Sequence, residues 1–310
     1  MPTAISHILQ AAVRGFRPLL NNLSLEMERM GQDVLARADV RLPENMVVAT
    51  DCIGDMRAEW FHTLGAPEDE VLIYFHGGAY MAGSIESNRI LAVDFAQATK
   101  RNVLSFEYRL APEHPFPAAL EDAIAAYRYV LDLGVKPERI AFVGESAGGG
   151  LEIVTALKAR ELGLPLPAVI VAISPWTDLT LRGKSYTENE RVDPLLLRKK
   201  LVRAVMYYAY GQDLQNSYIS PLYADFSGFP PTLIHVGTHE LLLSDAQGLH
   251  EAMLRDGVEV KLEEWKGMWH VWHVFDIPES RTAFMEIADY ISERISPGEP
   301  AQLEKEQADT

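Results

Sequence analysis

Short apolar runs alternate with amphipathic stretches along most of the chain. The apolar runs end at glycine or polar residues, as buried strands do, and the stretches between them repeat apolar residues at helical spacing. We expect strands at 70–75, 102–108, 139–144, 168–174, 232–237 and 258–265. We expect helices at 89–100, 118–133, 147–162, 244–255 and 278–295. Strands that alternate with helices predict βαβ units, and therefore an α/β fold with a mainly parallel central sheet flanked by helices.

A hairpin is predicted ahead of the first βαβ unit. The runs MVVATDC and MRAEWFH, residues 46–52 and 56–62, flank the short turn Ile53-Gly54-Asp55. Glycine next to aspartate is typical of a tight connection between paired strands. We expect this hairpin at one edge of the sheet.

Two regions interrupt the alternation. Residues 1–45 precede the sheet and have helical periodicity, whereas residues 178–226 separate two predicted strands. An insertion at the carboxyl end of a strand lies over the crevice where open α/β sheets bind ligands. We therefore expect 1–45 and 178–226 to form a helical cap over a core of 46–177 and 227–296. The polar, proline-containing tail 297–310 is expected to be disordered.

Charge and composition narrow the possible partners. The 310 residues include 44 acidic and 28 basic side chains, and a net charge of −16 repels nucleic acids and anionic lipid surfaces. No apolar run is long enough to span a membrane, and no signal peptide is evident, so we expect no stable membrane insertion. A single cysteine, Cys52, excludes an internal disulfide and suits a reducing, cytoplasmic location.

The sequence FVGESAGGG, residues 142–150, places one serine between two glycines. Ser146 follows a predicted strand and opens a predicted helix, which is the position of a nucleophile on a sharp turn. Side chains at positions 144 and 148 would collide with the strand and helix that cross there, and glycine removes them. The helix N-terminus directs backbone amides toward developing negative charge. We predict that Ser146 is a nucleophile, although an ordinary glycine-rich turn has the same local pattern.

A serine nucleophile needs a base, and the base needs an acid that orients it. In one known chain order, the acid and then the base follow the serine, each after a late strand. Glu240 lies directly after the strand 232–237, so we favour it over Asp245, which falls inside the next helix. His270 is closer to the end of the last strand than His273, so we favour His270 as the base.

A pair of backbone donors is predicted after the first parallel strand. His76-Gly77-Gly78-Ala79 ends that strand, and we call these residues the 76–79 loop. The amides of Gly77 and Gly78, together with that of Ala147, are our candidates for an oxyanion hole. A tight turn after a buried strand is the alternative interpretation.

Aromatic and methionine side chains near these segments are candidates for a substrate pocket. The candidates are Tyr80, Met81, Trp176, Met206 and Tyr207. The first three adjoin the 76–79 loop or the end of a strand, and the last two lie in the insertion. Plain packing of such side chains is the competing explanation.

Several motifs together resemble a known family. HGGAYMAGS, YRLAPEHPFPAALED, GESAGGG, SPWTDLT and GTHELLLSDA look like those of the hormone-sensitive-lipase-like esterases, bacterial family IV, over about residues 70 to 290. The resemblance implies an α/β-hydrolase fold with a helical cap, and hydrolysis of small carboxylic esters with short or medium acyl chains. It also implies the catalytic residues Ser146, Glu240 and His270, no metal or organic cofactor, and a monomer or homodimer.

The sequence departs from the family pattern at three positions. Ala79 stands where a third glycine is usual, Glu145 where aspartate is usual, and Glu240 where many members carry aspartate.

Two other functions remain open. A lactone or amide hydrolase would use the same triad, and related non-catalytic receptors keep the serine but lose the histidine, whereas this chain has His270.

Overall fold

An eight-stranded sheet forms the centre of the computed structural model, which describes residues 2–20, 23–36 and 42–295. The strands are β1 (Met46–Ile53), β2 (Met56–Thr63), β3 (Val71–Phe75), β4 (Asn102–Phe106), β5 (Ile140–Glu145), β6 (Val169–Ile173), β7 (Thr232–Gly237) and β8 (Val260–Trp265). They lie in the order β1-β2-β4-β3-β5-β6-β7-β8. β1 and β2 form the predicted edge hairpin, β2 is antiparallel to β4, and the strands from β4 to β8 are all parallel. The predicted α/β architecture is confirmed.

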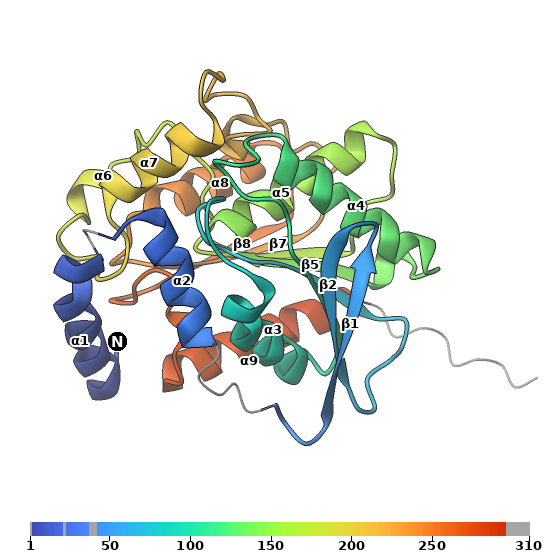
Figure 1. Ribbon diagram of the computed structural model, residues 1–310. Helices are drawn as coiled ribbons and strands as arrows, with labels where there is room; N and C mark the ends of the chain where they lie inside the picture. Colours follow the sequence, from blue (N-terminus) through green and yellow to red (C-terminus); the bar gives the residue numbers. More distant parts are fainter. Residues whose placement is uncertain (1, 21–22, 37–41, 296–310) are drawn as a thin grey trace, which may run out of the picture.

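Helices cover both faces of the sheet (Figure 1). One face carries α3 (Ile85–Thr99) and α9 (Pro278–Ser292), and the other carries α4 (Ala118–Asp132), α5 (Ala147–Glu161) and α8 (Leu243–Arg255). The side chains of β3 alternate between these faces, because Leu72 and Tyr74 join the core under α3 and α9 while Ile73 joins the opposite one. With apolar layers on both faces, parallel strands read as continuous apolar runs.

The chain reverses its direction across the sheet beside β3. After β3 the chain crosses to β4 on one side, and it later returns to β5 on the other side of β3. Such a switch point leaves a crevice at the carboxyl ends of the two strands, where open α/β sheets bind ligands. The 76–79 loop follows β3 and Ser146 follows β5, so the topology brings both to this crevice.

Within the described part of the chain, four further helices lie outside these two layers. They are α1 (Ala4–Leu20), α2 (Leu25–Ala36), α6 (Ser185–Glu188) and α7 (Arg198–Tyr208), with short 3₁₀ turns at Pro137–Arg139, Pro221–Tyr223 and Trp272–Val274. α2 is tied to α7, because Glu28 pairs with Lys200 at 2.6 Å and also with Arg203. Figure 1 shows α2 reaching up to α7 on the side of the molecule away from the β1–β2 hairpin.

One element boundary differs clearly from the expectation. α3 begins at Ile85, four residues before the predicted start at Arg89. Ser84 accepts a hydrogen bond from the Ser87 amide, and the Ser87 side chain in turn accepts one from the Ser84 amide. This reciprocal capping box satisfies two backbone donors and starts the helix within a polar stretch that hydrophobic periodicity does not mark.

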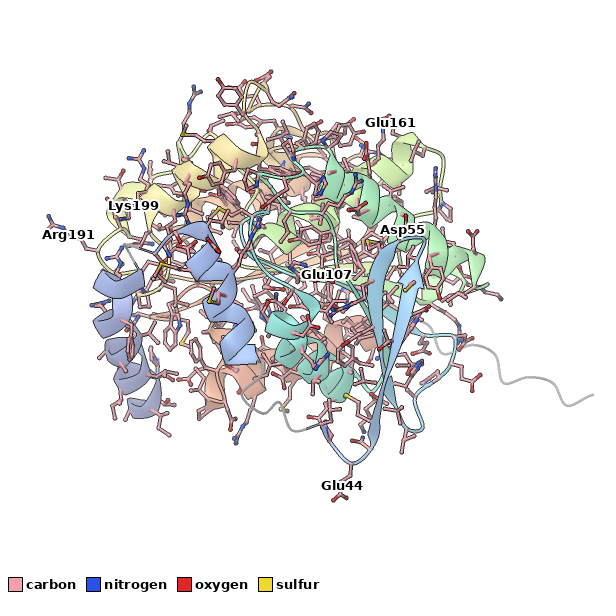
Figure 2. The ribbon with its side chains drawn as sticks, viewed as in Figure 1. Glu44, Asp55, Glu107, Glu161, Arg191 and Lys199 are labelled. Carbon is pink, nitrogen blue, oxygen red and sulfur yellow. The ribbon has the colours of Figure 1, made fainter. Side chains whose placement is uncertain are left out.

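The labelled charged side chains of Glu44, Asp55 and Arg191 point outward from the body of the molecule (Figure 2). All three residues are exposed. Among the described residues, no helix combines the length and the apolar character that crossing a bilayer requires. The predicted tail 297–310 lies outside the described residues.

Candidate active site

Ser146 lies on a sharp turn between β5 and α5. Its backbone has φ 56° and ψ −122°, which L-residues seldom adopt. A Cβ atom added to Gly148 would lie 1.9 Å from the carbonyl oxygen of Phe75, and one added to Gly144 would lie 2.8 Å from the Gly148 backbone. The two glycines therefore let α5 approach β3 closely enough to hold the strained serine in place.

A chain of hydrogen bonds joins Ser146, His270 and Glu240. The Ser146 Oγ atom lies 3.0 Å from His270 Nε2, and His270 Nδ1 lies 2.8 Å from Glu240 Oε2. Because a carboxylate can only accept, it places the imidazole proton on Nδ1 and leaves Nε2 free to accept the serine proton. The structure thus brings together the three side chains that the sequence singled out, from the ends of β5, β7 and β8.

Ser174, which the sequence analysis did not single out, links Glu240 to the backbone next to His270. Its hydroxyl donates to Glu240 Oε1 at 3.0 Å and accepts from the Val271 amide at 3.2 Å. Glu240 is fully buried, and its Oε1 also accepts from the Gly237 amide. Ser174 follows the end of β6, between the strands that lead to Ser146 and Glu240, and this position in the sheet is the only signal that could have indicated it.

The alternative acid and base lie elsewhere. Asp245 is buried inside α8, where it accepts hydrogen bonds from the amides of Thr177 and Asp178 at 2.9 and 2.8 Å. His273 is buried, and its Nε2 lies 3.3 Å from the Nδ1 atom of His235. Neither side chain takes part in the hydrogen-bonded chain to Ser146.

The 76–79 loop requires one correction to the predicted oxyanion hole. The amide of Gly77 donates to the buried carboxyl of Glu145 at 2.5 Å, so it is not available to a substrate oxygen. The amides of Gly78, Ala79 and Ala147 have no acceptor within the described part of the chain. The candidate pair of loop donors is therefore Gly78 and Ala79 instead of Gly77 and Gly78.

Glu145 directly precedes Ser146, and its side chain contacts the backbone of this loop. Burial raises the pKa of the Glu145 carboxyl to about 8, and the hydrogen bond from Gly77 only partly opposes that effect. Near neutral pH the carboxyl is therefore mostly protonated. A neutral carboxylic acid still accepts from Gly77 through its carbonyl oxygen, and it adds little negative charge beside the place where an oxyanion would form.

A cavity of about 440 Å³ opens beside Ser146, His270 and the loop. Its apolar lining residues are Leu23, Met27, Met81, Leu91, Leu195, Leu196, Leu201, Val271 and Val274. Glu28 and Lys200, which pair with each other, also line it. A larger cavity of about 620 Å³ between α3 and α9 contains none of the three hydrogen-bonded residues, so the smaller cavity is the one placed for chemistry.

Of the five predicted pocket residues, Met81 lines this cavity and four do not. Tyr80 and Trp176 are buried in an aromatic cluster, where the Tyr80 ring stacks on Tyr208 with centroids 4.0 Å apart. Met206 is 57% exposed on the outer side of α7, and Tyr207 packs against the edge of the main core. The wall comes instead from α2 and from residues 195–201, for which the sequence offered no motif.

The described residues contain no cluster of side chains that could bind a metal ion. Within residues 2–20, 23–36 and 42–295, no group of three or more histidine, cysteine or acidic side chains is placed to hold a metal ion.

Comparison with known proteins places the chain in a family. A family model described as an α/β-hydrolase fold matches residues 72–274. The chain belongs to this α/β-hydrolase family. An acetyl-hydrolase from Streptomyces hygroscopicus is 40% identical to this α/β-hydrolase over 86% of the chain and 89% of its own length. An esterase from Acinetobacter venetianus is 33% identical over 73% and 75% of the two chains.

Solved structures agree with this assignment. A hormone-sensitive lipase from a metagenome library superimposes with a TM-score of 0.90 at 37% identity, covering 94% of this α/β-hydrolase and 98% of the other chain. An esterase of the bacterial hormone-sensitive lipase family gives 0.89 at 35% identity, with 96% and 100% coverage. The resemblance to hormone-sensitive-lipase-like esterases is confirmed.

The buried Glu145 predicts a pH-dependent stability. Its pKa in the folded chain is about 8, above the usual value of 4.5, so folding favours the protonated form. The stability that it contributes is present at acidic pH and is lost as the pH rises from about 4.5 to 8. Glu145→Gln keeps an oxygen for Gly77 but cannot ionise. We expect the variant to gain stability relative to the wild type between pH 5 and pH 8, measured by urea unfolding.

An unchanged difference in unfolding free energy between the two proteins at pH 5 and pH 8 would contradict this account of Glu145.

The close contact at Gly148 predicts an intolerant position. Gly148→Ala should lower the free energy of unfolding by about 3 kcal/mol or more, because its Cβ would overlap the Phe75 carbonyl oxygen. Gly15→Ala is the matched control, since Gly15 also lies in a helix and has nothing within 4 Å of an added Cβ. Thermal and urea unfolding of both variants test the difference. Equal stability of the two variants would show that α5 and β3 are not so tightly apposed.

Proposed function

We propose that this α/β-hydrolase cleaves carboxylic esters with short or medium acyl chains through an acyl-enzyme on Ser146. The observation that supports it most is the hydrogen-bonded chain from Ser146 through His270 to Glu240, beside a cavity open to the serine. A hydroxyl, an imidazole and a carboxylate in this order form a general-base-activated nucleophile.

The reaction proceeds in two halves. His270 takes the Ser146 proton as the oxygen attacks the ester carbonyl, and Glu240 stabilises the imidazolium that forms. His270 then returns the proton to the leaving alkoxide, which departs and leaves the acyl group on Ser146. Water attacks the acyl-enzyme by the same route, with His270 again as base and then as acid. The products are a carboxylic acid and an alcohol.

The oxyanion is stabilised by the free amides of Gly78, Ala79 and Ala147. Gly78 is at φ 123° and its added Cβ would lie 2.0 Å from the Ala82 carbonyl oxygen, so only glycine fits this sharply turned loop. Ala79 is at φ 55°, and its amide serves in place of the one that Glu145 occupies. Losing one such donor typically costs about 3 kcal/mol of transition-state stabilisation.

The substrate class follows from the cavity. Its wall is mostly apolar, and the charges of Glu28 and Lys200 neutralise each other at 2.6 Å, which suits an uncharged acyl group. A volume of about 440 Å³ accommodates a short or medium chain rather than a long one. The relative from Streptomyces hygroscopicus is named an acetyl-hydrolase, which agrees with a small acyl group.

The helices outside the sheet layers would act as a cap. Leu23 and Met27 from the N-terminal segment, and Leu195 and Leu201 from the insertion 178–226, all line the cavity. The ion pairs of Glu28 link the two segments above the catalytic residues. They would exclude water and shape the acyl site, while the core 46–177 and 227–296 would carry the chemistry.

Lactones and amides would use the same acyl-transfer chemistry, and pocket shape decides among leaving groups. A non-catalytic receptor is the weaker alternative, because His270 lies within hydrogen-bonding distance of Ser146.

An acyl-length series tests the proposal. We expect turnover of p-nitrophenyl acetate and butyrate, with a steep decline for long chains that exceed the cavity. Ser146→Ala should lower kcat by more than about 10⁴-fold, because the nucleophile is lost. Initial rates on the ester series, a lactone panel and an anilide provide the measurement. A preference for the anilide, or comparable turnover by the variant, would refute the ester mechanism.

A second pair of variants tests the acid. Glu240→Gln should lower kcat by about 100-fold or more, because the amide neither fixes the imidazole tautomer nor balances its charge. Asp245→Asn changes a buried aspartate of the same region that does not contact His270, so kcat should change less than about two-fold. Steady-state kinetics on p-nitrophenyl butyrate measure both. The opposite ranking would make Asp245 the acid.

A further inference from the structure

The turn that carries the catalytic acid is held by the part of the insertion 178–226 that precedes α7. This acid turn, residues 238–242, connects β7 to α8. Asn189 donates its side-chain amide to two carbonyl oxygens of the turn, that of Thr238 at 3.1 Å and that of Glu240 at 2.8 Å. The Ser185 hydroxyl donates to the Leu241 carbonyl at 2.5 Å. The turn therefore depends on contacts from outside the sheet.

Asp193 makes the third contact with the acid turn. Its side chain is fully buried, although Arg191, two residues earlier, points to solvent (Figure 2). Asp193 Oδ2 accepts from the amide of Leu241, the residue after the catalytic acid, at 2.9 Å. This bond fixes the peptide group between Glu240 and Leu241, whose carbonyl oxygen accepts from Asn189.

The second oxygen of Asp193 holds the cavity wall. Oδ1 accepts from the amides of Leu195 and Leu196 at 2.9 and 2.8 Å. Both leucines line the cavity beside Ser146. One carboxylate thus connects the turn that carries the acid with the wall that would contact the acyl group.

We propose that Asp193 is a positioning residue that sets the Glu240–His270 pair in register with the acyl-binding wall. The inference rests on the proposed function, because it assigns Asp193 a role through Glu240. Three backbone amides converge on the two oxygens of Asp193, and only an acceptor with two free oxygens satisfies all of them. A shift of this side chain displaces the acid turn, and small displacements of catalytic groups cost rate steeply.

The charge of Asp193 is consistent with this role. Burial raises the pKa of Asp193 to about 6, while the nearby His270 and the amides of Leu196 and Leu241 oppose the rise. The carboxyl is therefore ionised at neutral pH. A positive charge on His270 favours the ionised form of Asp193, and the negative charge of Glu240 opposes it.

Asp245 provides a matched comparison within the same fold. It is also a buried aspartate, and it also accepts from two backbone amides, those of Thr177 and Asp178. It does not accept from the acid turn or from the cavity wall. Changing either aspartate to asparagine removes a buried acceptor, but only the change at Asp193 releases the backbone next to Glu240.

The test compares Asp193→Asn in two backgrounds. Asparagine keeps one oxygen and turns the other acceptor into a donor, which opposes at least one of the three amides. In the wild-type background we expect kcat on p-nitrophenyl butyrate to fall roughly 10-fold, with KM changed less than about three-fold. In the Glu240→Gln background the same change should lower kcat less than about two-fold, because its effect passes through Glu240.

Asp245→Asn, measured in both backgrounds, should lower the unfolding temperature without lowering kcat in either. The inference is overturned if Asp193→Asn leaves kcat unchanged, or lowers it equally in both backgrounds. If Asp193→Asn does not fold, Asn189→Ala replaces it, because Asn189 also holds the backbone of the acid turn. We expect the same smaller effect in the Glu240→Gln background, and the same outcomes would overturn the positioning of Glu240 by this segment. Wild-type turnover by Glu240→Gln alone would instead refute the proposed triad.

Discussion

The approach of α5 to β3 at Gly148 is the constraint on which the site depends. The Phe75 carbonyl lies where a side chain at position 148 would have to be, so the two elements are as close as polypeptide backbones allow. This contact sets the distance between the strained serine that starts α5 and the loop that follows β3. A nucleophile and its backbone donors lie within reach of one carbonyl group only when these two segments are so closely apposed.

Buried carboxyl groups hold the other segments of the site in place. Glu145 fixes the 76–79 loop through Gly77, Glu240 is fixed by Ser174 and Gly237, and Asp193 fixes the acid turn. In each case the acceptor is a carboxyl oxygen and at least one donor is a backbone amide. Burying a carboxyl group without such donors would cost free energy of folding. Each of these carboxyl groups is therefore stable only when the neighbouring backbone keeps the conformation that donates to it.

The sequence predicted the elements and the hydrogen-bonded residues because local patterns encode them. The glycines around Ser146 reflect a backbone contact, and closeness to the end of the preceding strand separated Glu240 from Asp245 and His270 from His273. It did not predict the cavity wall, because Met27 and Leu195 reach the site only through the packing of irregular segments.

The errors in the predicted site have the same origin. Tyr80 is adjacent to the 76–79 loop in sequence, yet its ring stacks on Tyr208 of α7, a tertiary contact that no local pattern announces. The predicted role of Gly77 fails because the Glu145 side chain reaches the Gly77 amide, a tertiary contact that the sequence does not encode locally. The sequence shows that Glu145 replaces the usual aspartate, but it does not show that this side chain points toward Gly77.

The ion pairs of Glu28 with Lys200 and Arg203 have a consequence for how such enzymes diversify. They join two segments that contribute none of the three hydrogen-bonded side chains but supply much of the wall of the cavity beside Ser146. Mutations in these segments would change the shape of the cavity without changing the hydrogen bonds among Ser146, His270 and Glu240. Substrate preference can therefore evolve through changes in these two segments, while Ser146, Glu240 and His270 stay unchanged.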